Sequence, residues 1–188
     1  MEEKQSNTAT LWKKPYFIPP LLAICVAYYF LRGRQGAPVA VILREALLLI
    51  GYIAAWIDLR EKRVPNQLIL ALLGVWVLMM VPQLFLNTEV ALQWLIAGAL
   101  GFALGGLIML VTYLLSRKGL GGADVKLMTV AGLYLGVSGI LFVLLVGSIL
   151  SAVVGVVLVL LKKQNWKGQI AFIPFLYIGI LVYSFLVG

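Results

Sequence analysis

The stretch LLLIGYIAAWIDLREKRVPN, residues 47–66, changes abruptly from hydrocarbon to charge. Its apolar half ends at Asp58, and basic residues, a proline and an asparagine follow by residue 66. The apolar run reaches back to residue 39, which makes it close to the roughly 20 residues that a helix needs to cross a bilayer. The stretch therefore predicts a transmembrane helix that ends at a membrane edge, with a carboxylate at that edge.

The composition of the whole chain is that of an integral membrane protein. Of its 188 residues 63% are hydrophobic, and the mean hydropathy is +1.05, whereas only about half of the residues of a soluble domain are apolar. At about 20 residues a span, the chain has room for about six or seven transmembrane helices and little else. We therefore expect an all-α fold, a polytopic bundle of six or seven transmembrane helices that forms a single membrane domain over residues 1–188.

Seven apolar segments are candidates for these helices. The fifth is short, so it is either a half-buried helix or fuses with the sixth through LGVSG, residues 135–139. The first has no small-residue cleavage site after it and is predicted to be a retained helix. The segments cover residues 16–31, 39–57, 67–86, 90–115, 125–136, 138–161 and 170–187.

Lysines and arginines in the predicted loops set the orientation. With seven helices, four basic clusters fall on one face, which the positive-inside rule assigns to the cytoplasm; Arg32 and Arg34 are the exceptions. The net charge of +8 is explained by this topology and by contact with anionic lipid, and nothing indicates a nucleic-acid partner. We expect a multi-pass protein of the cytoplasmic membrane. The clusters are Lys4, Lys13 and Lys14; Arg60, Lys62 and Arg63; Arg117, Lys118 and Lys126; and Lys162, Lys163 and Lys167.

The inventory of reactive side chains excludes several chemistries. There is no histidine, so neither a Ser-His nor a Cys-His nucleophile pair can form. The single cysteine, Cys25, lies in an apolar run and is read as a packed helix residue. We expect no metal and no cofactor.

The chain has only two aspartates, and both mark the edge of a predicted span. Asp124 follows glycines in GLGGADVKLM, residues 119–128, at the same predicted edge as Asp58. Ionisable groups at such a depth usually face a bundle interior or a water-filled cavity. Two adjacent carboxylates that share a proton can activate water for peptide hydrolysis without metal or histidine. The alternative is a pair of structural carboxylates held by basic neighbours, namely Arg60, Lys62 or Lys126.

The neighbours of the aspartates suit such a site. Gly121 and Gly122 allow unusual backbone angles and a close approach to Asp124. Pro65 disfavours a helical residue before it, and Asn66 is predicted to cap a helix that begins near Gln67.

These residues resemble the type IV prepilin peptidases, bacterial relatives of the archaeal preflagellin peptidases and of other membrane aspartyl proteases with a Gly-x-Gly-Asp motif. The resemblance runs from about residue 40 to the end and leaves the N-terminal helix of residues 1–37 outside, so residues 40–188 form the expected peptidase core. The first motif is Asp58, Leu59, Arg60, Arg63, Val64, Pro65 and Asn66; the second is Gly119, Gly121, Gly122, Asp124, Val125, Lys126 and Leu127; a weaker third is Phe172, Pro174, Phe175 and Gly179.

The resemblance implies an aspartyl endopeptidase that removes a short basic leader from prepilin or pseudopilin precursors, in type IV pilus assembly or protein secretion. Asp58 and Asp124 would be catalytic, near the cytoplasmic face, and Glu61 is a weaker candidate for a leader contact. Besides precursors, membrane lipid is the expected partner, and the oligomeric state stays open. The implied supporting residues are Gly121, Gly122, Ala123, Lys126, Pro65, Asn66 and Pro174.

The chain also departs from the family pattern. Ala123 stands where the stricter motif has glycine, and Ala171 and Ile173 replace a proline and a glycine in the third motif. Larger members carry a zinc-binding cytoplasmic domain between the first two helices, where this chain has only RGRQGAP, residues 32–38. We therefore expect a minimal form without N-methyltransferase activity.

Two other functions remain open at this point. A catalytically silent homologue that acts in pilus or secretion-system assembly would more naturally have lost an aspartate. A small ion- or proton-coupled transporter would have acids near mid-membrane and an internal repeat.

Overall fold

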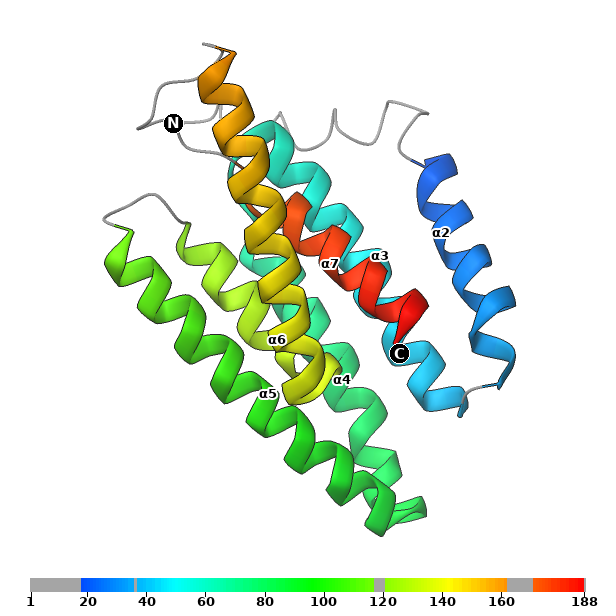
Figure 1. The fold of residues 1–188 in the computed structure, drawn as a ribbon. Coiled ribbons are helices and arrows are strands. Elements are labelled where there is room, and N and C mark those ends of the chain that lie inside the picture. The colour runs from blue at the N-terminus through cyan, green and yellow to red at the C-terminus, as the bar shows by residue number, and fades with distance from the viewer. Residues whose placement is uncertain (1–17, 36, 117–120, 162–170, 188) are drawn as a thin grey trace, which may run out of the picture.

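The computed structural model describes residues 18–35, 37–116, 121–161 and 171–187. These residues form six α-helices and one short 3-10 helix, η2 (Gly33–Gln35), and no strand, which confirms the all-α prediction (Figure 1). Helices α3 to α6 are each long and apolar enough to cross a membrane, whereas α2 and α7 are shorter. The helices are α2 (Ile18–Leu31), α3 (Pro38–Glu61), α4 (Asn66–Leu86), α5 (Thr88–Leu115), α6 (Gly122–Leu160) and α7 (Ile173–Leu186).

The link between α3 and α4 is short and has a local cause at each end. Lys62 ends α3 in the left-handed conformation, at φ 49°, and its backbone N–H still donates to the Asp58 carbonyl oxygen at 2.9 Å. Pro65 precedes the first residue of α4 and cannot continue a hydrogen-bond ladder from α3. The prediction that Asn66 caps α4 is wrong, because Asn66 is itself the first helical residue and its side chain bonds elsewhere.

Helix α6 folds back on itself at Gly136, which reconciles the predicted counts of six and seven helices. Both the Met128 carbonyl oxygen and the Ile140 side chain lie within about 3 Å of where a Cβ on Gly105 would be, at 3.2 and 2.9 Å. In a straight helix these residues would be about 18 Å apart. Gly136 has φ 65° and ψ −170°, a backbone conformation open essentially only to glycine. The predicted short fifth segment is thus the first arm of a helical hairpin (Figure 1).

The course of the helices brings the ends that carry the motifs together. The last turn of α3 and the first turns of α4, α6 and α7 lie at one end of the bundle, which we call the basic end (Figure 1). Described basic residues at these turns are Arg60, Lys62, Arg63 and Lys126, and Arg32 and Arg34 lie near the opposite end, between α2 and α3. The other basic residues of the four predicted clusters fall outside the described part of the chain.

Glycines let the backbones of α5 and α6 touch. A Cβ on Gly132 would lie 2.3 Å from the Gly101 carbonyl oxygen, and a Cβ on Gly101 would lie 2.3 Å from that of Gly132. Gly101 and Gly105, like Gly132 and Gly136, have the four-residue spacing that is typical of close helix packing in membranes.

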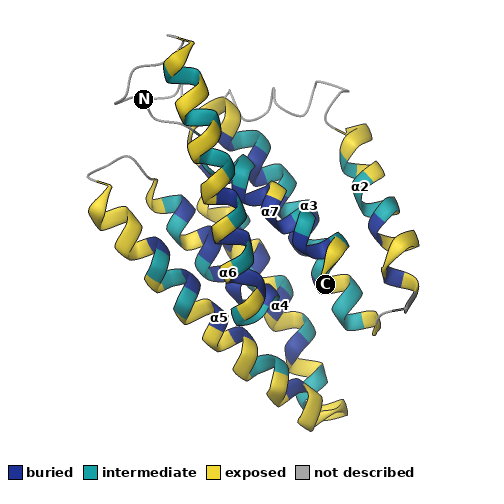
Figure 2. Cartoon of the chain, viewed as in Figure 1, coloured by how far each residue is buried: buried dark blue, intermediate teal, exposed yellow. Residues whose placement is uncertain are grey.

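The bundle is buried inside and apolar outside. Leu48, Leu72, Met128 and Ile140 are completely buried where the helices face one another. Large apolar side chains such as Leu107 on α5 are exposed, and the outward faces of α4 and α5 are largely exposed along their length (Figure 2). Apolar surface of this extent is unfavourable in water and is what a multi-pass membrane protein presents on its outside.

Candidate active site

Asp58 lies in the last turn of α3, with its carboxylate buried between α3 and the start of α7. Its side chain is 4% exposed. Its Oδ2 accepts a hydrogen bond from the backbone N–H of Ile173, the first residue of α7, at 3.2 Å. The N–H groups of a first helical turn have no partner within their own helix, so Asp58 satisfies one that would otherwise be unpaired. The third motif of the sequence therefore holds the first aspartate in place.

Asp124 occupies the third position of α6 and is held in a similar way. Its side chain is 7% exposed. The backbone N–H of Gly121 donates to Asp124 Oδ2 at 3.3 Å, and the Asp124 N–H donates back to the Gly121 carbonyl oxygen at 3.1 Å. The bond from the Gly121 N–H to the carboxylate is one half of a capping box, and it fixes the Asp124 side chain against the start of α6.

The two buried aspartates are close enough for their carboxylates to interact electrostatically. Each also faces the N-terminus of a helix, α7 for Asp58 and α6 for Asp124. A helix N-terminus carries a partial positive charge of about half an electron, so two such ends favour negative charge on the pair. Three helices, α3, α6 and α7, thus converge on a buried acidic pair.

The glycines before Asp124 provide space, not unusual angles. Gly121 has φ −80° and ψ 139°, which any residue adopts. A Cβ there would lie 3.4 Å from both Asp124 oxygens, and a Cβ on Gly122 would meet none of the described residues within 4 Å. The described residues therefore leave space on this side of Asp124, and Gly121 does not use the unusual angles that glycine allows. Ala123 packs against the core beside them, and Gly119 lies outside the described residues.

The basic residues around the pair have varied partners. Arg60 stacks over the Trp56 ring, 4.7 Å from its centre, and Lys126 donates to the Asn66 side chain at 3.5 Å. Neither of these two contacts involves an aspartate, whereas Lys62 interacts electrostatically with Asp58. The second contact joins the first motif to the second across 60 residues.

The remaining candidate residues lie at the same end of the bundle. Glu61 is exposed at the end of α3, one turn beyond Asp58. Pro65 is half-buried directly before α4, and Pro174 is half-buried at the second position of α7, where a proline needs no hydrogen bond.

Sequence reasoning missed the part that α7 plays. The replacement of glycine by Ile173 does not remove the contact to Asp58, because the donor is a backbone N–H and the side chain turns into the core, 1% exposed. The sequence does contain an indication of this contact, since Pro174 marks a helix start and the first N–H groups of a helix attract carboxylates.

Residues 46–156 match the model of the type IV leader peptidase family. This match covers more than half of the chain, both aspartates and the folded-back α6, and the chain belongs to that family.

Curated relatives agree over most of the chain. A prepilin leader peptidase/N-methyltransferase of Xanthomonas campestris pv. campestris is 29% identical over 160 residues, which are 85% of this chain and 53% of the relative. Proteins of the same name from Aeromonas hydrophila and Aeromonas salmonicida are 31% and 30% identical over 159 and 161 residues. The chain spans about half the length of these relatives. No solved structure matches.

Proposed function

We propose that this protein is an intramembrane aspartyl endopeptidase that removes the leader of prepilin-like precursors at the cytoplasmic membrane edge. The observation that carries the proposal is the buried pair of Asp58 and Asp124, which come from different helices and interact at one end of the bundle. Membership of the type IV leader peptidase family supports it. The positive-inside rule assigns the basic end to the cytoplasm.

The pair can carry out peptide hydrolysis with its own groups. Two buried carboxylates that interact electrostatically cannot both ionise readily, so they share one proton. The ionised one accepts a proton from water as that water attacks the scissile carbonyl carbon, and the protonated one donates toward the carbonyl oxygen. Collapse of the tetrahedral intermediate then breaks the C–N bond as the nitrogen takes up a proton. The open space beside Gly122 is where the scissile peptide would approach Asp124.

A groove on α4 offers a place for the apolar helix of the precursor. It is lined at helical spacing, i, i+3, i+4, i+7 and onward, which is the spacing of a groove that receives the side chains of a packed helix. Asn66 heads this face of α4, and it bonds Lys126, two residues from Asp124. The groove thus runs from the candidate catalytic end down the membrane span. Its lining residues are Leu70, Leu73, Gly74, Val77, Leu78, Val81 and Pro82.

Gly74 supports a partner outside the chain. A Cβ on Gly74 would meet none of the described residues within 4 Å, whereas Gly98, Gly101 and Gly132 each touch the backbone of another helix. Glycine in a helix interior costs about 1 kcal/mol relative to alanine, and no contact of Gly74 within the described part of the chain explains that cost. A helix of another molecule that packs against α4 at Gly74 would explain the cost. We assign this position to the apolar helix of the substrate. The exposed Glu61 would contact the basic leader.

Substitution of each aspartate by asparagine tests the proposal. Asn nearly matches Asp in shape but cannot exchange a proton at neutral pH. We expect Asp58→Asn and Asp124→Asn each to abolish cleavage of a prepilin substrate in isolated membranes, while expression and membrane insertion stay normal. The double variant should lose little more than either single variant, because losses within one catalytic unit do not add.

Glu61→Gln is the matched control, because it removes an acid at the same end that takes no part in the chemistry. It should cleave, with at most a weaker affinity for the leader. Robust cleavage by either Asn variant would refute the shared-proton pair and favour structural carboxylates. An ion or proton flux that the Asn variants lose, with no cleavage by the unaltered protein, would favour the transporter.

A further inference from the structure

A second charged feature lies away from the aspartates. Arg44, the seventh residue of α3, lies about 9 Å along the helix from Pro38 and is half-buried within a membrane-spanning segment. A cation at this depth is costly, so it is rarely found without a counter-charge or a function. The prepilin peptidase proposal gives Arg44 no part.

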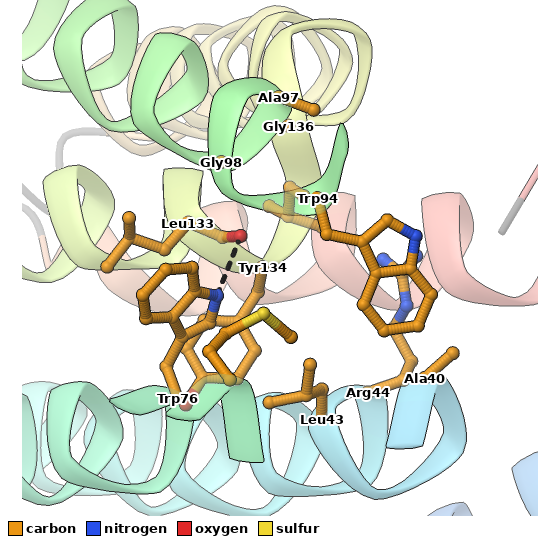
Figure 3. A pocket seen from close by; sticks show the side chains of 12 residues that line it. Ala40, Leu43, Arg44, Trp76, Trp94, Ala97, Gly98, Leu133, Tyr134 and Gly136 are labelled. Atoms are coloured by element: carbon orange, nitrogen blue, oxygen red, sulfur yellow. Dashed lines mark hydrogen bonds between the residues drawn. The ribbon is translucent and has the colours of Figure 1, made fainter. Parts of the chain in front are cut away.

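Arg44 lines a cavity of about 270 Å³ between α3, α4, α5 and the bend of α6 (Figure 3). Three of the lining side chains are aromatic, those of Trp76, Trp94 and Tyr134, and most of the other lining residues are apolar. The cavity is bounded by the glycine-only bend at Gly136, so it lies away from the end that carries Asp58 and Asp124.

Two polar side chains of the cavity wall are paired, whereas one nitrogen of Arg44 is not. Trp76 Nε1 donates to the Leu133 carbonyl oxygen at 3.1 Å (Figure 3). The Tyr134 hydroxyl donates to the Leu72 carbonyl oxygen. The Nη1 atom of Arg44 is buried and has no hydrogen-bond partner among the described residues. Elsewhere the guanidinium contacts Tyr28 and lies over the Tyr183 ring, and both groups are uncharged.

No acid among the described residues lines the cavity beside Arg44. Glu45 is adjacent in sequence but hydrogen-bonds Cys25 on α2. Glu89 is exposed at the start of α5 and does not line the cavity. The helix N-terminus of α3, at Pro38, adds positive potential at this end of the span. The cavity therefore favours an anion from outside the chain.

We propose that this cavity binds the headgroup of an anionic phospholipid from the leaflet opposite the aspartates, with the phosphate on Arg44. Side chains of a helix point toward its N-terminus, so Arg44 reaches toward the outer end of α3. Trp94 has the amphipathic ring that is typical of the headgroup level. The apolar lining accommodates the glycerol and the first carbons of the acyl chains.

The size of the cavity favours a headgroup over a protein segment. One turn of an α-helix, about 10 Å wide and 5.4 Å high, occupies about 420 Å³, which exceeds the volume of the cavity. A zwitterionic choline headgroup brings a cation beside Arg44 and the start of α3, so an anionic lipid is preferred. The bound lipid would join α3, which carries Asp58, to the bend of α6, which carries Asp124.

Lipid retention tests this inference independently of proteolysis. The purified full chain, in detergent with phosphatidylglycerol or phosphatidylcholine, is examined by native mass spectrometry. We expect one retained phosphatidylglycerol and much less phosphatidylcholine. Arg44→Gln should lower this retention about tenfold or more, since hydrogen bonds to charged groups are strong. Arg34→Gln, which removes an exposed arginine at the same end, is the matched control and should retain the lipid.

A second variant keeps the test valid if Arg44→Gln does not fold. Ala97 is exposed at the rim of the cavity, and Ala97→Phe should fill the cavity and displace the lipid while Arg44 stays in place. The proposal would be overturned if both variants retained as much phosphatidylglycerol as the unaltered chain. It would also be overturned if the unaltered chain retained as much phosphatidylcholine as phosphatidylglycerol. Stabilisation by inorganic phosphate to the same extent as by phosphatidylglycerol would show a phosphate site without a lipid preference. Crosslinking from residue 97 to a prepilin instead of lipid would also refute it.

Discussion

Substitution of Gly132 by alanine should disturb the catalytic pair from a distance. A Cβ on Gly132 would lie 2.3 Å from the Gly101 carbonyl oxygen and 2.7 Å from the Phe102 backbone nitrogen. Real Cβ contacts essentially never fall below 3.0 Å, so α5 and the first arm of α6 must separate by about 0.7 Å, the difference between 3.0 and 2.3 Å. Backbone atoms cannot rotate away as a side chain does. Overpacking of this kind costs about 1 to 3 kcal/mol of stability.

The same arm carries Asp124 eight residues from Gly132, so the separation reaches the active site. A misplacement of about 1 Å can lower a rate about a hundredfold, and we expect kcat/KM for prepilin cleavage to fall between about tenfold and a hundredfold. Gly101→Ala should act in the same way. The double variant should cost less than the sum of the two single variants, because the first change already separates the helices.

Cleavage of a purified precursor in detergent gives the rate, and a thermal melt of the same preparation gives the stability. Gly74→Ala is the control for the thermal melt, because its Cβ meets none of the described residues and the change should raise the melting temperature through helix propensity alone. A Gly132→Ala variant with unaltered rate and melting temperature would refute the backbone contact between α5 and α6. Loss of stability with unaltered kcat/KM would refute the coupling of that contact to Asp124.

Four further results are expected. Gly136→Ala should lower the melting temperature, since φ 65° with ψ −170° costs a residue with a side chain about 1 to 3 kcal/mol; an unchanged melt would contradict this. Ala123→Gly should retain cleavage and Ala123→Val should lose most of it, because β-branching stiffens the backbone beside Asp124; equal cleavage would place residue 123 away from the reaction. Gly74→Leu should slow cleavage of a full precursor but not of a short peptide without the apolar helix, whereas a groove that only contacts lipid or a second copy leaves both rates unchanged. The rate should fall at low pH, where the general base is protonated, and again at high pH, where the general acid is ionised; a rate independent of pH would exclude the shared-proton mechanism.

The parts of the fold that could be predicted from the sequence are those that depend on local chemistry. Apolar length predicts each span, because a bilayer requires about 20 residues of helix whatever their neighbours are. The end of α3 beyond Asp58 follows from the charged run and Pro65. Close packing of the helices that carry Gly101 and Gly132 follows from the four-residue spacings Gly101–Gly105 and Gly132–Gly136, since small residues let membrane helices touch. The placement of both aspartates at one end of the bundle follows from counting spans between them.

Other features depend on which elements meet in space. The hydrogen bond from Ile173 to Asp58 joins residues 115 positions apart, and no local pattern specifies it. Asn66 has the sequence preference of a cap, yet Lys126 from another helix takes its side chain. The sequence marked LGVSG, residues 135–139, as either a break or a continuous helix, and the bend at Gly136 lies inside it. The sequence could not decide between the two, because glycine permits both a straight helix and a reversal.

The sequence by itself determined the membrane class, the apolar helices and the two acids at their ends, since these depend on the composition of each segment. Only the tertiary structure decided that two helix N-termini hold the acidic pair, that α6 reverses and that Arg44 lines a cavity with no acid among its described lining residues. These features arise from the packing of helices against one another, and in a membrane that packing depends on the fit between side chains from distant parts of the chain.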